Sequence, residues 1–594
     1  MFRYTFKRFY RNKGILVITF LAIILCVNFG GIVSSTRDLN TELRVGLITR
    51  ITMALYFMVC SYEFFSQIQR SGMEEIVRIG GLKKEYWNSF LIFLLLDVFV
   101  SLINVWVGFW ENKSFFYVFE PLYLSFIIQI CLVYYILPFL ISILVGIVFS
   151  KITKRLYAYV AILCSYMLWN GMITAPLKYS YQSNLIIYRL IDIFSIFNRD
   201  FRGLLDALYY ISVDPVEYEK VLFWLFFALT GLMLVFVGKR NLPLLGVCTF
   251  LCILCFGLFM QPSGEFYCDE GVRNSWMDDQ YYYMRKPSLL NLEKEGGFSI
   301  RKISGKLTFG RELSGDIKIE VDQDDLEEYS FTLYHGYKVK KITDERGKEL
   351  PFKQSIDALY VYPKESTKVF HIYYKGCSRV FYATYTASNL PGFFAYVPIA
   401  GVRTIYYKDD RYKQYNLSGN GYDIDYDLTI GSPQKVYSNL KEVSDHHFVG
   451  KTDGVSLVSS AFLKVDQRDH CRIIYSYLDA FSEQSNHESR NRELSEKIKS
   501  FGITDPKFTV FDLGVNNASV PYINQDHIYD MEMAKGLYSI YQSTGVMPSD
   551  FGYSENGRLQ QIGEKLTEET EEMEKEETED VEVNAQKNTE EGDK

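Results

Sequence analysis

The chain has 594 residues, which is too long for one ordinary domain, and 48% of them are hydrophobic. Its net charge is −8, but basic side chains dominate the first 13 residues and Glu dominates the end of the chain. The histidines begin only at His335, which excludes a haem or histidine-metal site from the apolar first part, ending at about Pro262. Seven of the ten cysteines lie in apolar segments, where they behave as small hydrophobic residues, and the other three lack zinc-site spacing.

Residues 1–13 predict a short amphipathic helix at the cytoplasmic surface of a membrane. Phe2 and Phe6 fall towards one side of such a helix, and Arg3 and Lys7 fall towards another. This pattern is typical of a helix that lies among lipid headgroups. An ordinary basic flank of the first span is the alternative interpretation.

Seven apolar stretches are long enough to cross a bilayer, which takes about 20 residues. The first lacks a small-x-small cleavage site and six others follow it, so we interpret it as a retained span and not as a signal peptide. The stretches cover about residues 14–34, 45–65, 90–110, 121–149, 156–175, 221–237 and 242–260.

Basic residues in the short loops predict the orientation of these spans. With a cytoplasmic N-terminus, four basic clusters lie inside: 3–13, 70–84, 151–155 and 239–240. An odd number of spans then places everything after Gln261 outside the cell, which argues against a G-protein-coupled receptor. We expect a multi-pass protein of the bacterial plasma membrane.

The loop between the second and third spans contains a predicted amphipathic helix over about residues 72–81. Gly80 or Gly81 provides the left-handed stop that a helix C-terminus favours. A short helix held between two spans can transmit force from a cytosolic partner.

With this loop, the basic start and six spans up to Arg240, the sequence resembles the type-2 exporter class of ABC permeases. The resemblance covers residues 1–240 and implies a six-span permease domain over 14–240, with re-entrant outer helices over about 184–218. It implies separate ABC ATPase subunits, a second permease subunit of the same or a different kind, and the lipid bilayer as partners. It also implies ATPase coupling through Arg70, Gly72, Glu74, Glu75, Arg78, Gly80, Gly81, Lys83 and Lys84.

ATP and magnesium should bind to the partner ATPase, and we expect no cofactor on this chain. The nearest match to a phosphate-binding loop runs from Asp445 to Thr452 and lacks the first glycine of that motif. It also lies in the part that we place outside the cell. We therefore interpret it as a chance match.

Asp97 is a carboxylate about midway along the third predicted span. Burying a charged side chain there costs about 3 kcal/mol on insertion scales, and such residues usually face a bundle interior or a transport pathway. The alternative is an Asp that a neighbouring helix satisfies or that stays protonated. Arg50 should lie roughly 9 Å nearer the outer face, so we expect no direct pair.

After a seventh span over 241–261, which would act as a tether, the pattern changes to strands. Ile317, Ile319 and Val321 show the alternation of an antiparallel β-sandwich. We predict a mainly-β extracellular sandwich domain over 262–470 and an α/β extension over 471–556, with a helical stretch from Ile474 to Ser500. The acidic residues 557–594 should be disordered.

Within this part, the runs Tyr329–Phe352, Phe370–Gly376 and Leu390–Pro398 resemble the N-terminal β-sandwich of the aminopeptidase N class of zinc peptidases, over about residues 299–467. Those enzymes need a His-Glu-x-x-His helix. The nearest string begins at His487-Glu488 and has Asn491 at the second histidine position, so the resemblance implies a lost zinc site. We predict no metal ligand and no catalytic residue, and interpret His446 and His447 as a solvated pair rather than a metal site.

These features favour the permease subunit of an ATP-driven ABC exporter that is not itself an enzyme, with an outside domain for substrate binding or gating. The substrate would be a peptide or an amphiphile. The main alternative is a membrane-anchored receptor or sensor whose sandwich binds a ligand. A membrane-tethered zinc peptidase is a third, weaker alternative. We expect no nucleic-acid partner.

Overall fold

The computed structural model of the chain forms two compact units, one from Met1–Asp200 and Ile211–Gln261 and the other from Phe201–Tyr210 and Pro262–Lys594. The structure describes residues 2–33, 39–70, 82–111, 121–180, 185–197, 208–209, 212–236, 242–264, 282–283, 293–378, 380–408, 413–416, 419–476, 487–500, 503–513 and 522–529. The predicted coupling helix at 72–81 and the acidic tail at 557–594 lie outside these ranges.

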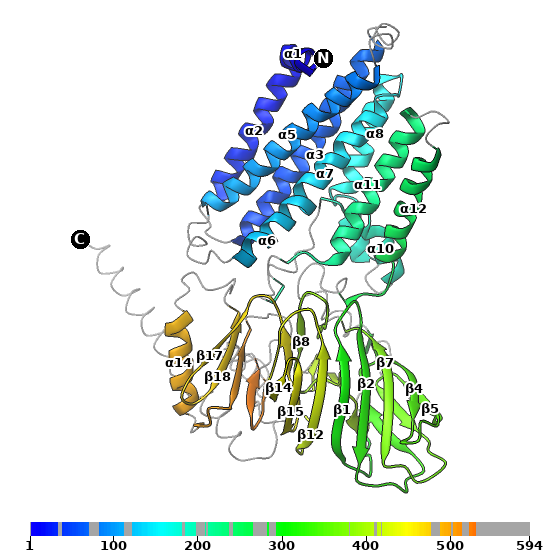
Figure 1. Ribbon diagram of the computed structural model, residues 1–594, viewed down its shortest axis with the longest axis vertical. Coiled ribbons are helices and arrows are strands. Elements are labelled where there is room, and N and C mark those ends of the chain that lie inside the picture. Colours follow the sequence, from blue (N-terminus) through cyan, green and yellow to red (C-terminus); the bar gives the residue numbers. More distant parts are fainter. Residues whose placement is uncertain are drawn as a thin grey trace, which may run out of the picture. The chain divides into compact units, whose positions relative to one another are not determined.

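The described part of the first unit is helical (Figure 1). Its elements are α1 Phe2–Arg11, α2 Lys13–Val33, α3 Leu39–Arg70, α5 Leu82–Glu111, α6 Pro121–Ile130, the π-helix η3 Cys131–Ile136, α7 Leu137–Phe149, α8 Arg155–Trp169, α9 Thr174–Ser180, α10 Leu185–Asp192, α11 Pro215–Phe236 and α12 Leu242–Phe259.

Within the part of the chain that the structure describes, four helical stretches are long and apolar enough to span a membrane: Glu85–Asn104, Leu124–Phe149, Pro215–Val235 and Leu242–Phe259. On α12, large apolar side chains such as Phe250 and Ile253 stay mostly exposed, at 64% and 66%, as expected for a lipid-facing helix. These helices agree with association of the first unit with a membrane. Their predicted orientation and the bacterial plasma membrane remain predictions.

Helix α3 lies at the centre of the first unit and packs against α2, α5, α7 and α8. Its aromatic side chains Phe57 and Phe64 are fully buried and contact rings of the neighbouring helices, including Phe139 of α7 and Phe93 of α5. Gly146 of α7 lies directly against the α3 backbone, because a Cβ atom there would come within 2.5 Å of the Met58 carbonyl oxygen.

The second unit is mainly β, as predicted. Its largest sheet has the strand order β14-β15-β12-β1-β2-β7-β4, and the others are β5-β6-β3-β9, β13-β16-β8, β17-β18-β19-β21-β20 and β10-β11. The strands are β1 Ile300–Thr308, β2 Leu313–Val321, β3 Tyr329–Thr332, β4 Tyr337–Thr343, β5 Phe352–Ser355, β6 Ala358–Val361, β7 Val369–Gly376, β8 Ser388–Leu390, β9 Ile399–Ala400, β10 Tyr406–Lys408, β11 Lys413–Tyr415, β12 Ile424–Gly431, β13 Val436–Ser438, β14 Lys441–Ser444, β15 His447–Thr452, β16 Leu457–Ser459, β17 Leu463–Gln467, β18 Arg472–Ser476, β19 Thr509–Asp512, β20 Tyr522–Ile523 and β21 His527–Tyr529; α14 is His487–Ser500.

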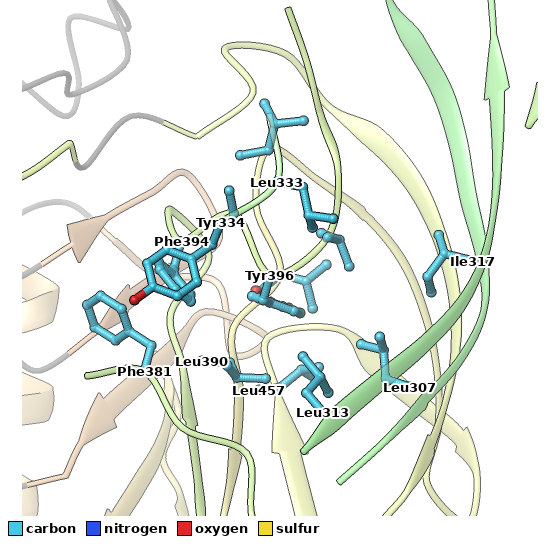
Figure 2. Close-up of a cluster of buried hydrophobic side chains, with 14 of the residues drawn as sticks. Leu307, Leu313, Ile317, Leu333, Tyr334, Phe381, Leu390, Phe394, Tyr396 and Leu457 are labelled. Atoms are coloured by element: carbon cyan, nitrogen blue, oxygen red, sulfur yellow. The ribbon is translucent and has the colours of Figure 1, made fainter. Parts of the chain in front are cut away.

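The alternation that the sequence shows places one face of the largest sheet in a shared core. Along β2, Ile317, Ile319 and Val321 are buried while the residues between them are not. Figure 2 shows Leu307 and Ile317 of this sheet pointing towards Tyr396 and Leu457. In this largest sheet, one pair departs from the antiparallel expectation, since β1 and β12 run parallel. The long connection between these two strands makes a parallel pair possible.

Strand β17 pairs with β18 through the register Leu463–Ser476 to Gln467–Arg472, so the five-stranded sheet includes residues on both sides of residue 470. The stretch expected to be helical from Ile474 starts as strand, because Ile473, Ile474 and Tyr475 have β-branched or aromatic side chains that pack in a sheet. Helix follows only in α14, from His487.

The predicted re-entrant helices over 184–218 lie partly outside the described residues. Within 185–197 the described helix is α10, and the segment Phe201–Tyr210 belongs to the second unit. There Leu208 and Tyr209 are buried in the β core. The Tyr209 hydroxyl lies 2.5 Å from Thr384 Oγ1, and its ring lies 4.9 Å from that of Tyr382.

Candidate functional site

Three of the predicted coupling residues lie at the ends of two described helices. Arg70 is the last residue of α3, and Lys83 and Lys84 are in the first turn of α5. Gly72, Glu74, Glu75, Arg78, Gly80 and Gly81 lie outside the described residues. The structure therefore describes the two helix ends that flank residues 71–81.

Glu85, in the first turn of α5, connects α5 to α1, and its partner Arg8 continues the connection to α3. It is only 3% exposed, and its carboxylate accepts hydrogen bonds from Thr5 Oγ1 at 2.8 Å and from Arg8 Nη1 at 3.1 Å. Arg8 also donates to the Phe64 carbonyl oxygen of α3 at 2.9 Å and lies 4.2 Å from the centre of the Phe64 ring. A buried carboxylate with two donors, one of them charged, is well compensated for its desolvation.

Glu63 makes the corresponding connection between α3 and α8. Its carboxylate accepts from Arg155 Nη2 at 2.9 Å, from Tyr159 Oη at 2.5 Å and from Arg70 Nη1 at 3.3 Å. Arg70 donates further to the Tyr62 hydroxyl at 2.6 Å. The side chain of Glu63 is 18% exposed, whereas that of Arg155 is 62% exposed, so this connection is partly open to solvent.

Together these residues form what we call the helix-end network: Thr5, Arg8, Glu63, Arg70, Glu85, Arg155 and Tyr159. It connects α1, α3, α5 and α8 beside the ends of residues 71–81. None of the bonds provides a nucleophile or an acid-base pair, so the arrangement holds helices in position. The sequence predictions included Arg70 but missed Glu63 and Glu85. The sequence did offer one signal for these two residues. Glu63 and Glu85 are acids at the ends of apolar stretches whose other flanking charges are basic.

Asp97 is fully buried on α5, as the sequence suggests. Ser101 Oγ donates to its Oδ1 at 3.2 Å, while Oδ2 has no hydrogen-bond partner within the described part of the chain. The guanidinium of Arg50 lies 5.4 Å and 5.7 Å from the ring centres of Tyr134 and Tyr135. Those two tyrosines belong to the π-helix η3, which packs against α5, and single π turns occur frequently at functional sites.

A second buried charge cluster lies on α9, α10 and α11. Asp192 is 1% exposed, pairs with Lys178 and lies 3.2 Å from Lys220 Nζ. Burial alone raises the pKa of the Asp192 carboxyl. The two lysines lower the pKa by more than burial raises it, so the pKa is below the ordinary value. Glu217 Oε2 lies 3.8 Å from Lys220. Buried ion pairs of this kind fix the positions of the helices that carry them.

In the second unit, Ser456, His527 and Asp526 are hydrogen-bonded in series. Ser456 Oγ lies 2.8 Å from His527 Nε2, and His527 Nδ1 lies 2.7 Å from Asp526 Oδ1. The order is that of a serine hydrolase triad. However, Ser456 and His527 are both fully buried, and the Ser456 oxygen accepts the Gly392 N–H at 2.9 Å. A hydroxyl without access to a substrate is structural.

The residues that could resemble a zinc-peptidase site do not fit zinc. Asn491 occupies the second ligand position on α14, is 1% exposed and donates to Asp466 Oδ2 at 3.1 Å. His447 instead lies 2.7 Å from Asp427 Oδ1, and His446 is in a turn with φ of 55°. Among the described residues, no group of three or more His, Cys, Asp or Glu side chains could hold a metal ion.

No protein-family model and no curated protein matches the sequence. Solved structures that resemble the chain are M1 zinc peptidases. They include the M1 zinc metallopeptidase from Deinococcus radiodurans at 13% identity and a TM-score of 0.28, covering 42% of this chain and 65% of that one. Another is an aminopeptidase N family protein from Idiomarina loihiensis at 11% identity and a TM-score of 0.28, covering 41% and 47%.

Yeast LTA4 hydrolase in complex with bestatin is also similar, at 10% identity and a TM-score of 0.26, with coverage of 44% and 47%. This chain thus spans at most 65% of the length of these proteins. With TM-scores this low, the similarity assigns neither a fold family nor an activity to this chain.

Proposed function

We propose that the chain is the membrane-spanning permease subunit of an ATP-driven ABC exporter whose energy comes from a separate ATPase chain. The observation that carries this proposal is the helix-end network. Glu63 and Glu85 connect four helices beside the two ends of residues 71–81, where the sequence places the coupling helix. A peptide or an amphiphile is the proposed substrate class.

In this proposal the ATPase acts on residues 71–81 when it binds ATP. The movement reaches the end of α3 at Arg70 and the start of α5 near Glu85. Because Glu85 is bonded to α1 and Glu63 is bonded to α8, a displacement of either end moves the attached helices as well. Direct bonds between helix ends transmit such a movement, whereas a free loop would absorb it.

Co-purification from the native membrane with mass spectrometry of the bound chains tests the proposal. The wild-type chain should recover a stoichiometric ATPase with a Walker motif, and the variant Glu74→Ala, Glu75→Ala, Arg78→Ala should lose it. Glu85→Gln should keep the ATPase bound but reduce substrate-stimulated ATP hydrolysis, because coupling and binding are separate steps. Recovery of no ATPase under mild detergent would overturn the proposal.

A membrane-anchored receptor or sensor is the second candidate, and one observation favours it. The β unit contains an open cleft of about 1080 Å³ with charged walls, large enough for a small ligand. A receptor would need no ATPase partner. Ligand binding by a chain that never recovers an ATPase would therefore favour this candidate over the permease.

A further inference from the structure

The cleft in the β unit lies between the β14–β15 edge of the largest sheet and the five-stranded sheet. Its volume is about 1080 Å³. One wall comes from Lys441, Val449 and Lys451, and the facing wall comes from residues 503–508 and 524–526. Arg472, at the start of β18, also lines the cleft.

The register of the strands explains why both lysines of the first wall face the cleft. Lys441 of β14 pairs with Val449 of β15, so the two side chains are on the same sheet face. Lys451 is two residues beyond Val449 and returns to that face. The two ammonium groups are therefore diagonal neighbours, within about 8 Å at their Cβ atoms, and can contact one ligand.

The cationic groups of the cleft have few partners. Lys441, Lys451 and Lys507 are exposed, and none makes an ion pair within the part of the chain that the structure describes. Arg472 uses Nη2 to donate to the Ser438 carbonyl oxygen and to Thr509 Oγ1, but its buried Nε has no partner among those residues. Burial lowers the pKa of Arg472, although nearby Glu442 partly opposes that effect.

The two acids of the cleft, in contrast, already accept hydrogen bonds from other groups of the protein. Asp526 accepts hydrogen bonds from His527 and from Asn439 Nδ2, the latter at 2.8 Å. Asp505 Oδ1 accepts the Lys507 N–H at 2.9 Å and closes its own turn. Four cations and two acids line the cleft, which leaves a net charge of +2. An unoccupied guanidinium N–H beside two lysines is the chemistry that binds a carboxylate or a phosphate.

We propose that this cleft binds a small ligand that carries two or more anionic groups, either carboxylates or phosphates. Arg472 would hold one group, and Lys441 and Lys451 would hold another. Gly450 and Lys451, part of the chance match to a phosphate-binding loop, take part here as residues of a strand wall and not as a nucleotide loop. The inference concerns only the β unit and does not depend on the permease proposal.

Isothermal titration of the full-length protein in detergent, with citrate and separately with pyrophosphate at matched ionic strength, tests the inference. Saturable binding of citrate identifies a carboxylate site, and saturable binding of pyrophosphate identifies a phosphate site. The variant Lys441→Gln, Lys451→Gln changes only exposed side chains and should weaken binding at least about tenfold, as two lost charge-assisted bonds would. Arg472→Gln should weaken it as well.

Lys353→Gln is the matched control, because Lys353 is exposed on β5 of another sheet and does not line the cleft. Its affinity should equal that of the wild type. Two results would overturn the inference. One is the absence of saturable binding of either anion, and the other is unchanged affinity in a folded Lys441→Gln, Lys451→Gln variant.

Discussion

At the scale of single residues, Glu85 carries the most specific prediction for the membrane unit. Glu85→Gln keeps an acceptor for Thr5 but leaves Arg8, whose side chain is 21% exposed, without its carboxylate. Removing one member of a buried ion pair costs about 3 kcal/mol or more, and partial exposure of Arg8 reduces this to about 2 kcal/mol. We expect faster amide hydrogen exchange in α1 and a lower melting temperature.

Lys7→Gln provides the control for that change. Lys7 is exposed on the same helix, so its replacement removes one positive charge without opening a buried pair. Exchange in α1 should then match the wild type. Equal exchange in the Glu85→Gln and Lys7→Gln variants would show that the bond to Glu85 does not hold α1 in place.

The Asp526 carboxylate gives a prediction of pH dependence. Burial alone raises the pKa of Asp526. His527, Asn439 and Thr452 together lower the pKa by more than burial raises it, which leaves the pKa below the ordinary value. Because the folded-state pKa is below the unfolded value of about 3.9, its stabilisation is complete at neutral pH and is lost as the pH falls through the folded-state pKa. Asp526→Asn should destabilise the β unit by about 1–3 kcal/mol at pH 7.

The difference between wild type and Asp526→Asn should therefore shrink as the pH falls below about 4. Thermal unfolding followed by the β-sheet circular-dichroism signal measures it across the pH range. A difference that stays constant from neutral pH to acid would mean that the charge of Asp526 does not stabilise the fold.

At the scale of elements, hydropathy and alternation predict those helices and strands whose conformation depends on the residues of one segment alone. The apolar helices and the buried alternation of β2 depend on their own residues and were predictable. The pairs Thr5–Glu85 and Glu63–Tyr159 join residues 80 and 96 positions apart, and no local pattern specifies such partners. The side chains around Ile474 favour a strand, and the pairing with β17 and β19, which no local pattern specifies, stabilises it.

The crossing of α3 and α7 depends on one glycine. A Cβ atom at Gly146 would lie 2.0 Å from Ser61 Oγ, 2.5 Å from the Met58 carbonyl oxygen and 3.1 Å from the Tyr62 nitrogen. The serine hydroxyl can rotate away, but the α3 backbone cannot move without separating the helices. Overpacking of this kind costs about 1–3 kcal/mol, so Gly146→Ala should lower the melting temperature in detergent.

Gly246→Ala is the matched control, since a Cβ atom at Gly246 of α12 meets nothing within 4 Å. Alanine also has the higher helix propensity, by about 1 kcal/mol, so this variant should be as stable as the wild type or more stable. Equal behaviour of the two alanine variants would show that α3 and α7 do not make the close contact described above.

At the scale of the whole molecule, each of the two units is built from segments that are not consecutive in the chain. A sequence reading assigns the connection between α10 and α11 to the membrane part, because apolar helices flank it on both sides. The structure assigns Phe201–Tyr210 to the β unit, so the chain passes between the units three times. This assignment depends on Leu208 and Tyr209, which pack in a core built from residues far away in the sequence. No pattern within the connection itself predicts it.

The last prediction concerns this inserted segment. Ser460 Oγ donates to the Leu208 carbonyl oxygen at 2.6 Å, and the Tyr209 ring is 2% exposed. Tyr209→Ala removes a buried aromatic side chain, which costs about 3–5 kcal/mol, whereas Tyr209→Phe keeps the ring and loses the hydroxyl with its bond to Thr384, worth about 1 kcal/mol. Unfolding of the β unit in the full-length chain should follow that order.

Protease cleavage within residues 198–211 distinguishes release of this segment from unfolding of the whole β unit. If Leu208 and Tyr209 hold the segment in the β unit, Tyr209→Ala should make it cleavable at temperatures where the β unit is still folded. Tyr385→Ala, at a tyrosine that is 44% exposed, should leave cleavage unchanged. A Tyr209→Ala chain that resists cleavage until the β unit unfolds would mean that contacts other than those of Tyr209 hold the segment.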